Sequence, residues 1–176
     1  TQSHEETIII NLPQLIDEGR TILILTERIS QVSYLYDYIE ERKIASVGKY
    51  IGRLKQEVLD ESLKCRIIVG TYNMIEEGFD CKSLDTLIMA TPKVDIEQSV
   101  GRILRKQKDE RTIKPLVIDV YDQFANCVNK GKRRLTFYKK QKYNLSKKMV
   151  DDNQTPTLVI DMKEEPKKKK KIVYNF

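Results

Sequence analysis

The sequence predicts an α/β fold, an open parallel sheet with helices on both faces, followed by a basic helical extension at the C-terminal end. Several short segments are apolar throughout, which is typical of strands buried on both faces. They alternate with segments whose apolar residues recur at helical spacing, as in the βαβ units of a parallel sheet. The chain has 176 residues, enough for one domain with a core and an extension, because domains cluster at about 100 to 150 residues.

The predicted strands fall within the first 120 residues, after one short helix. The apolar runs that predict them lie at residues 22–25, 44–47, 66–70, 86–90 and 116–120. Before the first run, residues 8–16 predict a short helix that ends at Gly19. Pro13 is expected to break or kink this helix unless it lies in the first turn.

Helices are expected between the predicted strands. Thr26 is expected to cap a helix that runs to about residue 42. Residues 55–63 predict a second helix. Thr71 is expected to cap a third, short helix that Gly78 ends.

The net charge of +6 is concentrated near the C-terminal end. Residues 130–171 carry 15 Lys and Arg against 5 Asp and Glu, whereas the rest of the chain carries 17 against 21. A polyanion is the natural partner for this end, and a solvated charge run that aids solubility is the alternative. We expect an α/β lobe at residues 1–124, a basic helical extension at 125–145 and a flexible Lys-rich tail at 146–176, with one short strand at 157–160 inside the tail.

The basic extension also contains aromatic residues. Residues 130–142 hold seven Lys and Arg and no acid, interleaved with Phe137 and Tyr138. Aromatic side chains in such a segment are more often packed in a core than stacked on bases. We therefore expect Phe137 and Tyr138 to dock against the α/β lobe, with the basic side chains facing a phosphate backbone.

Cysteine usage and hydropathy narrow the class of protein further. Cys65, Cys81 and Cys127 are odd in number and include no C-x-x-C pair, so we expect neither a disulfide framework nor a zinc site, and a reducing location fits. No apolar run approaches the about 18 to 20 residues of a membrane helix, so no membrane partner is expected. Residues 1–11 carry no leader pattern, and we expect the chain to be a piece of a longer protein.

One segment combines two arginines, an amide and a glycine on a single helical stripe. Residues 95–105 read D-I-E-Q-S-V-G-R-I-L-R, and Gln98, Gly101, Arg102 and Arg105 share one face. Guanidinium groups match phosphate oxygens bidentately. A glycine costs about 1 kcal/mol in a helix, which close approach of a ligand would explain. A bound phosphate would account for the whole stripe, and surface arginines that aid solubility are the alternative.

A second segment follows the predicted strand at 66–70. It reads T-Y-N-M-I-E-E-G-F-D from Thr71 to Asp80. Ligands of open α/β sheets bind outside the carboxyl ends of the strands, where the Thr71 hydroxyl and a helix N-terminus would offer a phosphate site. A plain cap and a plain helix stop at Gly78 are the alternative. Thr26 and Gly52, which follow other strands, are weaker candidates.

Together and in this order, these segments resemble the C-terminal RecA-like lobe of superfamily 2 helicases and translocases. The resemblance covers about residues 8–122. Residues 22–28 match the fourth motif, residues 69–80 the fifth, as T-x(5)-E-G-x-D, and residues 98–105 the sixth, as Q-x-x-G-R-x-x-R. The residues of the sixth motif, Q-S-V-G-R-I-L-R, and the R-x-x-x-Y-K-K pattern at 134–140 most resemble the corresponding segments of helicases from large DNA viruses and phages.

The resemblance implies roles for the matching residues. Arg102 and Arg105 match arginine fingers that reach the γ-phosphate of ATP, and Gln98 matches a residue that orients the phosphate or the attacking water. Gly78 and Asp80 match positions that face the ATP ribose. Finger arginines are worth on the order of 10³ to 10⁵ in the rate of phosphoryl transfer.

The resemblance also implies contacts with DNA or RNA. Motif residues of this lobe grip the backbone of the tracked strand, which couples the nucleotide state to the grip. The residues that we expect to contact nucleic acid, in the motifs and in the basic extension, are Thr71, Thr26, Gly52, Lys132, Arg133, Lys139 and Lys140.

Two elements of an ATP site are absent from these 176 residues. Neither G-x-x-x-x-G-K-[ST] nor D-E-x-[DH] occurs in the sequence. In the resembling family, ATP and Mg²⁺ are held mainly by an N-terminal RecA-like lobe. We expect that lobe of the same protein to be a partner, and the chain alone to be inactive.

Two other classes of function fit part of the sequence. The chain could be a non-catalytic nucleic-acid-binding or regulatory module on a helicase-like fold that has lost its ATPase function. The intact sixth motif argues against such a loss. Alternatively the basic end could be the main docking arm, with the α/β lobe as its scaffold. The run at 166–171 resembles a nuclear import signal, and a lysine tail that binds phosphates is the alternative. An intracellular, reducing location is expected, with the nucleus and a viral replication site as the two options.

Overall fold

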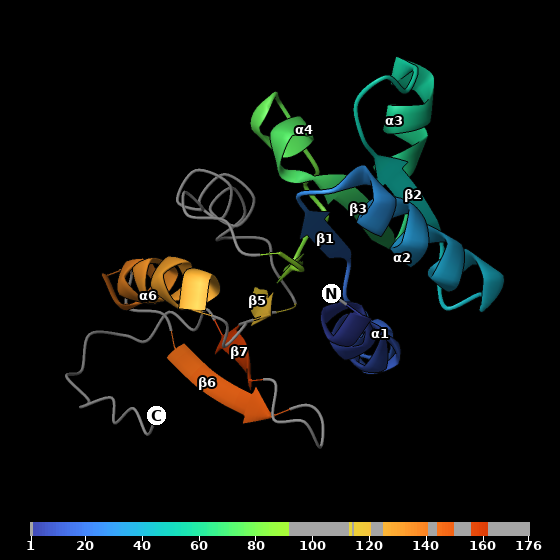
Figure 1. Ribbon diagram of the computed structural model, residues 1–176. Helices are drawn as coiled ribbons and strands as arrows, with labels where there is room; N and C mark the ends of the chain where they lie inside the picture. The colour runs from blue at the N-terminus through green and yellow to red at the C-terminus, as the bar shows by residue number, and fades with distance from the viewer. Residues whose placement is uncertain are drawn as a thin grey trace.

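The computed structural model describes residues 2–91, 113, 115–120, 125–140, 144–149 and 156–161. Strands and helices alternate along most of this part of the chain (Figure 1). The elements are α1 (Gln2–Asp17), β1 (Ile22–Thr26), α2 (Ile29–Glu41), β2 (Val47–Tyr50), α3 (Gln56–Ser62), β3 (Ile67–Thr71), α4 (Tyr72–Glu76), β4 (Thr86–Met89), β5 (Leu116–Val120), α6 (Ala125–Lys140), β6 (Asn144–Met149) and β7 (Pro156–Asp161).

The strands form one sheet in the order β2-β3-β1-β4-β5-β7-β6. The first five are parallel to one another, as the apolar runs predicted. β1 and β3 are buried along their whole length, because helices cover both faces of the sheet. This confirms the predicted open parallel sheet.

The sheet continues beyond β5 with two antiparallel strands. β7 pairs with β5, and β6 pairs with β7. The sequence predicted a strand only near residues 157–160, inside a flexible tail, so β6 and this part of the tail differ from that expectation. The division into parts at residues 124 and 145 stays a prediction.

Two apolar clusters lie on opposite faces of the sheet. α1 and α2 cover one face with Ile8, Leu12, Val32 and Leu35, which pack with strand residues such as Ile24. On the other face, side chains from α3, α4 and α6 pack against alternate strand residues. Neighbouring residues of each buried strand therefore point into different clusters, which explains why these strands are apolar throughout.

Three local expectations need correction. α1 continues through Pro13 for 16 residues, because burial of Leu12 and Leu15 on the sheet offsets the hydrogen bond that proline cannot make. Thr26 does not cap α2, because β1 extends to Thr26 and the N-cap residue is Arg28. β2 lies three residues later than predicted, since its pairing with β3 starts at Val47.

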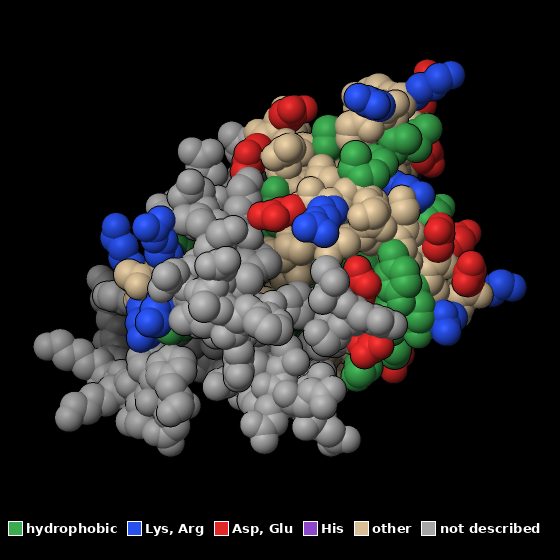
Figure 2. Space-filling model, viewed as in Figure 1, with side chains coloured by type: hydrophobic (Ala, Val, Ile, Leu, Met, Phe, Trp, Pro, Cys, Tyr) green, Lys and Arg blue, Asp and Glu red, His purple; other side chains and the backbone are tan. Residues whose placement is uncertain are grey.

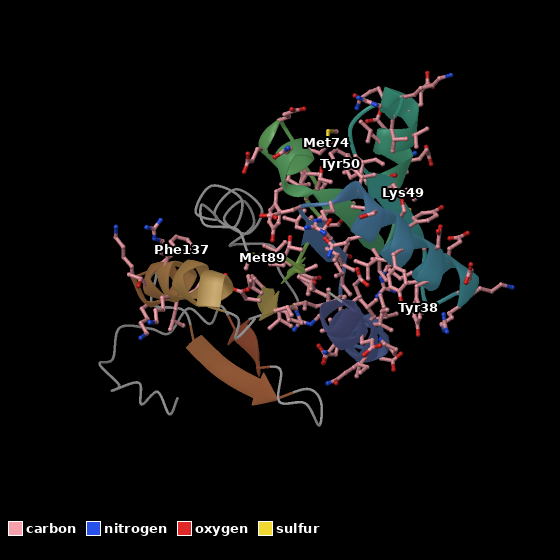
Figure 3. All side chains as sticks on the ribbon, in the orientation of Figure 1. Tyr38, Lys49, Tyr50, Met74, Met89 and Phe137 are labelled. Atoms are coloured by element: carbon pink, nitrogen blue, oxygen red, sulfur yellow. The ribbon has the colours of Figure 1, made fainter. Side chains whose placement is uncertain are left out.

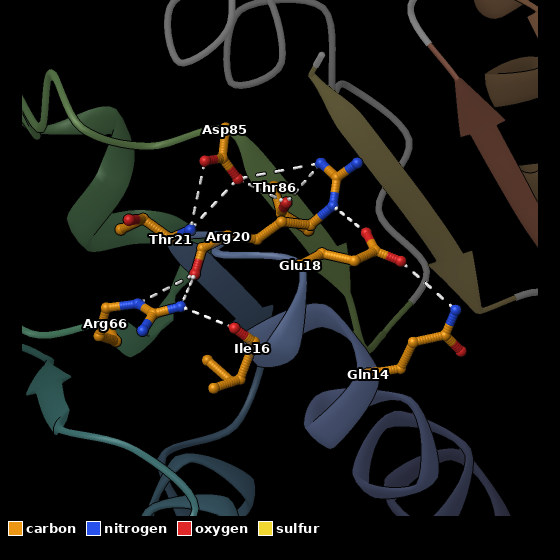
Figure 4. A network of polar contacts seen from close by, with 8 residues as sticks. All are labelled: Gln14, Ile16, Glu18, Arg20, Thr21, Arg66, Asp85 and Thr86. Carbon is orange, nitrogen blue, oxygen red and sulfur yellow. Dashed lines mark hydrogen bonds and ion pairs between the residues drawn. The ribbon is translucent and has the colours of Figure 1, made fainter. Parts of the chain in front are cut away.

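A polar network ties α1 to the amino ends of the strands (Figure 4). The Arg66 guanidinium donates to the carbonyl oxygens of Ile16, at 3.1 Å, and Arg20, at 2.9 Å. Arg20 in turn donates to Glu18 and to the Thr86 hydroxyl. The bonds from Arg66 reach carbonyl groups at and after the end of α1, and the Ile16 carbonyl also accepts the Gly19 N–H at 2.9 Å. This edge of the sheet is therefore structural.

One close approach fixes α3 on β2. A Cβ atom on Gly48 would lie 2.5 Å from the Ser62 Cβ and 2.6 Å from its Cα. The Ser62 hydroxyl donates to the carbonyl of Lys49 at 2.9 Å. Only glycine at position 48 lets the helix and strand approach to this distance.

Candidate functional site

The carboxyl ends of the parallel strands bring the predicted motif residues together. Thr26 and Thr71 are register partners at the ends of β1 and β3. Tyr50, at the end of β2, pairs with Gly70. Residues of the predicted fourth and fifth motifs therefore share one edge, opposite the polar network of Figure 4.

Thr91 links three segments at this edge and was not predicted from the sequence. The backbone N–H of Glu27 donates to the Thr91 hydroxyl at 2.9 Å, and the Tyr72 hydroxyl donates to the Thr91 carbonyl at 2.7 Å. The residue after β4 thus holds both the loop after β1 and the start of α4. A threonine directly after an apolar run was the only signal in the sequence.

The two motif threonines are both buried and differ in how their hydroxyl groups are used. Thr26 is fully buried, and its hydroxyl donates to the Arg28 carbonyl at 2.9 Å, which shapes the turn into α2. Thr71 occupies the N-cap position of α4, as predicted, but makes no side-chain cap hydrogen bond. Thr26 therefore positions the edge through its turn, whereas the Thr71 side chain is not used as a cap.

The loop after β2 also reaches this edge. A Cβ atom on Gly52 would meet only the Met74 Sδ, at 3.9 Å, so the Gly52 backbone is open to close approach. The next residue, Arg53, is exposed and has a φ of 69°, in the left-handed region that L-residues rarely adopt. Met74 packs against the cluster that contains Tyr50 (Figure 3), which holds α4 beside this loop.

The segment from Gly78 to Asp80 is anchored by an aromatic pair. Phe79 is buried and packs edge-on against Tyr50, with ring centroids 5.0 Å apart. Gly78 has a φ of 131° and open space around it, and Asp80 is exposed. Burial, and then the Asp60 carboxylate, raise the pKa of Tyr50 above its ordinary value, so its hydroxyl stays protonated at neutral pH.

α6 docks on the lobe through the predicted aromatic residues. Phe137 and Tyr138 are buried in the cluster that includes Met89 (Figure 3). The Tyr138 hydroxyl donates to the buried Asp119 carboxylate at 3.2 Å. The expected packing of both aromatic residues against the α/β core is confirmed.

The predicted basic residues of α6 are exposed. Figure 2 shows Lys and Arg side chains gathered over this helix, at the left of the view. The four that the sequence analysis named are Lys132, Arg133, Lys139 and Lys140. Lys132 and Lys139 lie on the side of α6 opposite its buried aromatic residues, whereas Arg133 and Lys140 flank Phe137, four and three residues away along the helix.

The sixth-motif residues Gln98, Arg102 and Arg105 lie outside the described residues. Their predicted roles as catalytic residues stay predictions. Among the residues that the structure describes, no group of three or more His, Cys, Asp or Glu could hold a metal ion. No helix in the same residues is long and apolar enough to cross a membrane.

The five parallel strands, the helices on both faces and the shared carboxyl edge define a RecA-like lobe. The chain belongs to the helicase conserved C-terminal domain family, whose model matches residues 7–107. Its fold is that of the C-terminal lobe of superfamily 2 helicases. Its curated relatives are proteins of large DNA viruses, as the sixth motif indicated.

Two viral relatives illustrate the similarity. The chain is 40% identical over 149 residues to "Putative ATP-dependent RNA helicase L396" of Acanthamoeba polyphaga mimivirus, which covers 83% of this chain and 28% of the relative. It is 30% identical over 137 residues to "Putative helicase 161L" of Invertebrate iridescent virus 6, which covers 69% and 30%. The chain thus spans less than a third of the length of either relative.

Solved structures share the fold. The structure of T4 UvsW matches with a TM-score of 0.56 and 20% identity, over 79% of this chain and 33% of that chain. The C-terminal domain of the DEAD-box protein Dbp5 matches with a TM-score of 0.55 and 14% identity, over 73% and 79%. At these identities the matches establish the arrangement of the sheet and helices.

Proposed function

We propose that this chain is the C-terminal motor lobe of a nucleic-acid-dependent ATPase, a helicase or translocase. The observation that carries the proposal is the meeting of Thr71, Thr26 and Gly52 at one carboxyl edge of a lobe of the helicase family. Thr71 and the open Gly52 backbone contact the tracked strand of DNA or RNA. The buried Thr26 holds the turn beside them.

The nucleotide binds between this lobe and an N-terminal lobe that carries the P-loop and the acidic box. Gly78 and Asp80 face the ribose, and the open space around Gly78 fits a group that approaches the backbone. Gln98, Arg102 and Arg105 face the phosphates, where the arginines stabilise charge that develops during transfer. ATP and Mg²⁺ would be held mainly by the N-terminal lobe; when bound, ATP would supply the phosphoryl group and Mg²⁺ would neutralise part of its charge.

The sixth motif provides the test in the full-length protein. Arg102→Ala and Arg105→Ala should each lower nucleic-acid-stimulated turnover by at least about 10³, while ATP affinity changes far less, because the fingers act on transition-state charge. Steady-state ATPase assays and nucleotide titrations measure both quantities. Near-normal turnover in either variant would mean that this arginine is a surface residue that aids solubility and does not act in catalysis.

Thr71→Ala tests the grip separately. It should weaken the stimulation of turnover by DNA or RNA more than it lowers turnover without nucleic acid. Ser83→Ala, which removes an exposed hydroxyl in the loop before β4, is the matched control and should leave the stimulation unchanged. Equal stimulation in wild type and Thr71→Ala would remove Thr71 from the proposed contact.

A further inference from the structure

We propose that the exposed face of α6 binds the phosphate backbone of duplex nucleic acid, independently of base sequence. This site is separate from the carboxyl edge that holds Thr71, Thr26 and Gly52. The inference goes beyond the proposed motor function and does not require it. It rests on the charge of α6, on the way the helix is docked, and on which of its side chains remain exposed.

The charge of α6 is of one sign. Its sequence, A-N-C-V-N-K-G-K-R-R-L-T-F-Y-K-K, contains no Asp or Glu. Within the described part of the chain, Lys132 and Arg133 form no ion pair. Lys139 and Lys140 lie in the last turn, where they also complement the helix dipole. The dipole does not explain Lys132 and Arg133, which lie two turns earlier.

Tyr138 docks α6 near the carboxyl ends of β4 and β5. Tyr138 contacts Asp119 in β5 and Met89 in β4, which are register partners near the carboxyl ends of their strands. Lys139 and Lys140 follow Tyr138 directly.

The exposed chemistry favours a duplex. Single strands are held largely by stacking of bases on aromatic side chains, but Phe137 and Tyr138 are buried in the core. From Lys132 to Lys140 the helix rises about 12 Å. The same length of duplex carries about seven phosphate charges, roughly twice the density of one strand. Among the described side chains of α6, the exposed ones are Lys132, Arg133, Thr136, Lys139 and Lys140; none of these is aromatic, so they match that surface by charge.

Salt dependence of binding tests the proposal on the 176-residue chain. The probes are DNA and RNA duplexes of about 20 base pairs in two unrelated sequences, titrated by fluorescence anisotropy at about 50 to 200 mM KCl. K132Q/R133Q and K139Q/K140Q should each flatten the slope of log affinity against log salt by about 1 to 2, since each phosphate contact contributes about 0.9. The loss should be the same for both sequences.

Matched controls distinguish a localised binding site on α6 from a general effect of the net charge of the chain on binding. K43Q/K64Q removes the same charge from exposed positions in the turns after α2 and α3 and should leave the slope unchanged. K139R/K140R keeps the charge and should bind like wild type. Each variant should keep its melting temperature, because the buried aromatic anchors are intact.

Three results would overturn the proposal. The first is an unchanged slope in both glutamine variants of α6, the second an equal loss in K43Q/K64Q, and the third tighter binding of single strands than of duplexes. None of these would affect the ATPase test of Arg102 and Arg105. Conversely, normal turnover in those arginine variants would leave the duplex site of α6 standing.

Discussion

Gly48 shows how a single residue sets the distance between a strand and a helix. Any side chain at this position would meet the backbone of Ser62 as well as its side chain, so rotation of Ser62 cannot make room. The hydroxyl of Ser62 also spans the same gap to the Lys49 carbonyl. The position of α3, and of the loop that precedes it, depends on this missing Cβ atom.

At the residue scale, Gly48→Ala should destabilise the chain by about 1 to 3 kcal/mol, the range for overpacking a close contact. Gly52→Ala is the matched control, because a Cβ atom there has open space. It should change the free energy of unfolding by less than about 0.5 kcal/mol. Urea unfolding measures both, and equal stability of the two variants would contradict the steric argument.

α1 shows how one element is held by residues far from it in the sequence. Its apolar side packs on the sheet, and its last turn is held by Arg66, which lies at the amino end of β3 (Figure 4). The guanidinium of Arg66 is the donor for two carbonyl groups, one in α1 and one after it. The helix end and the start of the sheet therefore form one unit.

At the element scale, Arg66→Met should lower the free energy of unfolding by about 1 to 3 kcal/mol, because two carbonyl groups lose a charged donor. Hydrogen exchange should show faster opening of the last turn of α1 than of α2. Arg53→Met, which changes an exposed arginine, is the control and should leave exchange in α1 as in wild type. Unchanged protection in Arg66→Met would mean that packing alone holds the helix.

At the scale of the whole molecule, the lobe has a complete two-sided core but lacks the P-loop and the acidic box. We therefore expect the 176-residue chain to unfold in one cooperative transition and to show no nucleic-acid-stimulated ATPase activity. Calorimetry and a phosphate-release assay measure the two properties. Robust turnover by contaminant-free chain would contradict the two-lobe account.

The parallel strands and the family motifs were predictable because each depends on nearby residues. Strands buried on both faces are apolar throughout, and the motif residues have fixed spacing. The Thr91 bonds were not predictable, because Glu27 and Thr91 are 64 residues apart and meet only through the register of β1 and β4. Pro13 was misjudged for a similar reason, since burial of its neighbours on a distant sheet decides the length of α1.

The order of the strands has a consequence for aggregation. An edge strand with unpaired backbone groups is a template for pairing with another chain, and lysines on the edge oppose this. Among the described strands, β2 and β6 lie at the two edges; β2 contains Lys49, and β6 contains Lys147 and Lys148. A chain that stopped before β6 would expose β5, L-V-I-D-V, which has no lysine. With β7 in place, β5 is paired on both sides, and we expect truncation before β6 to promote self-association.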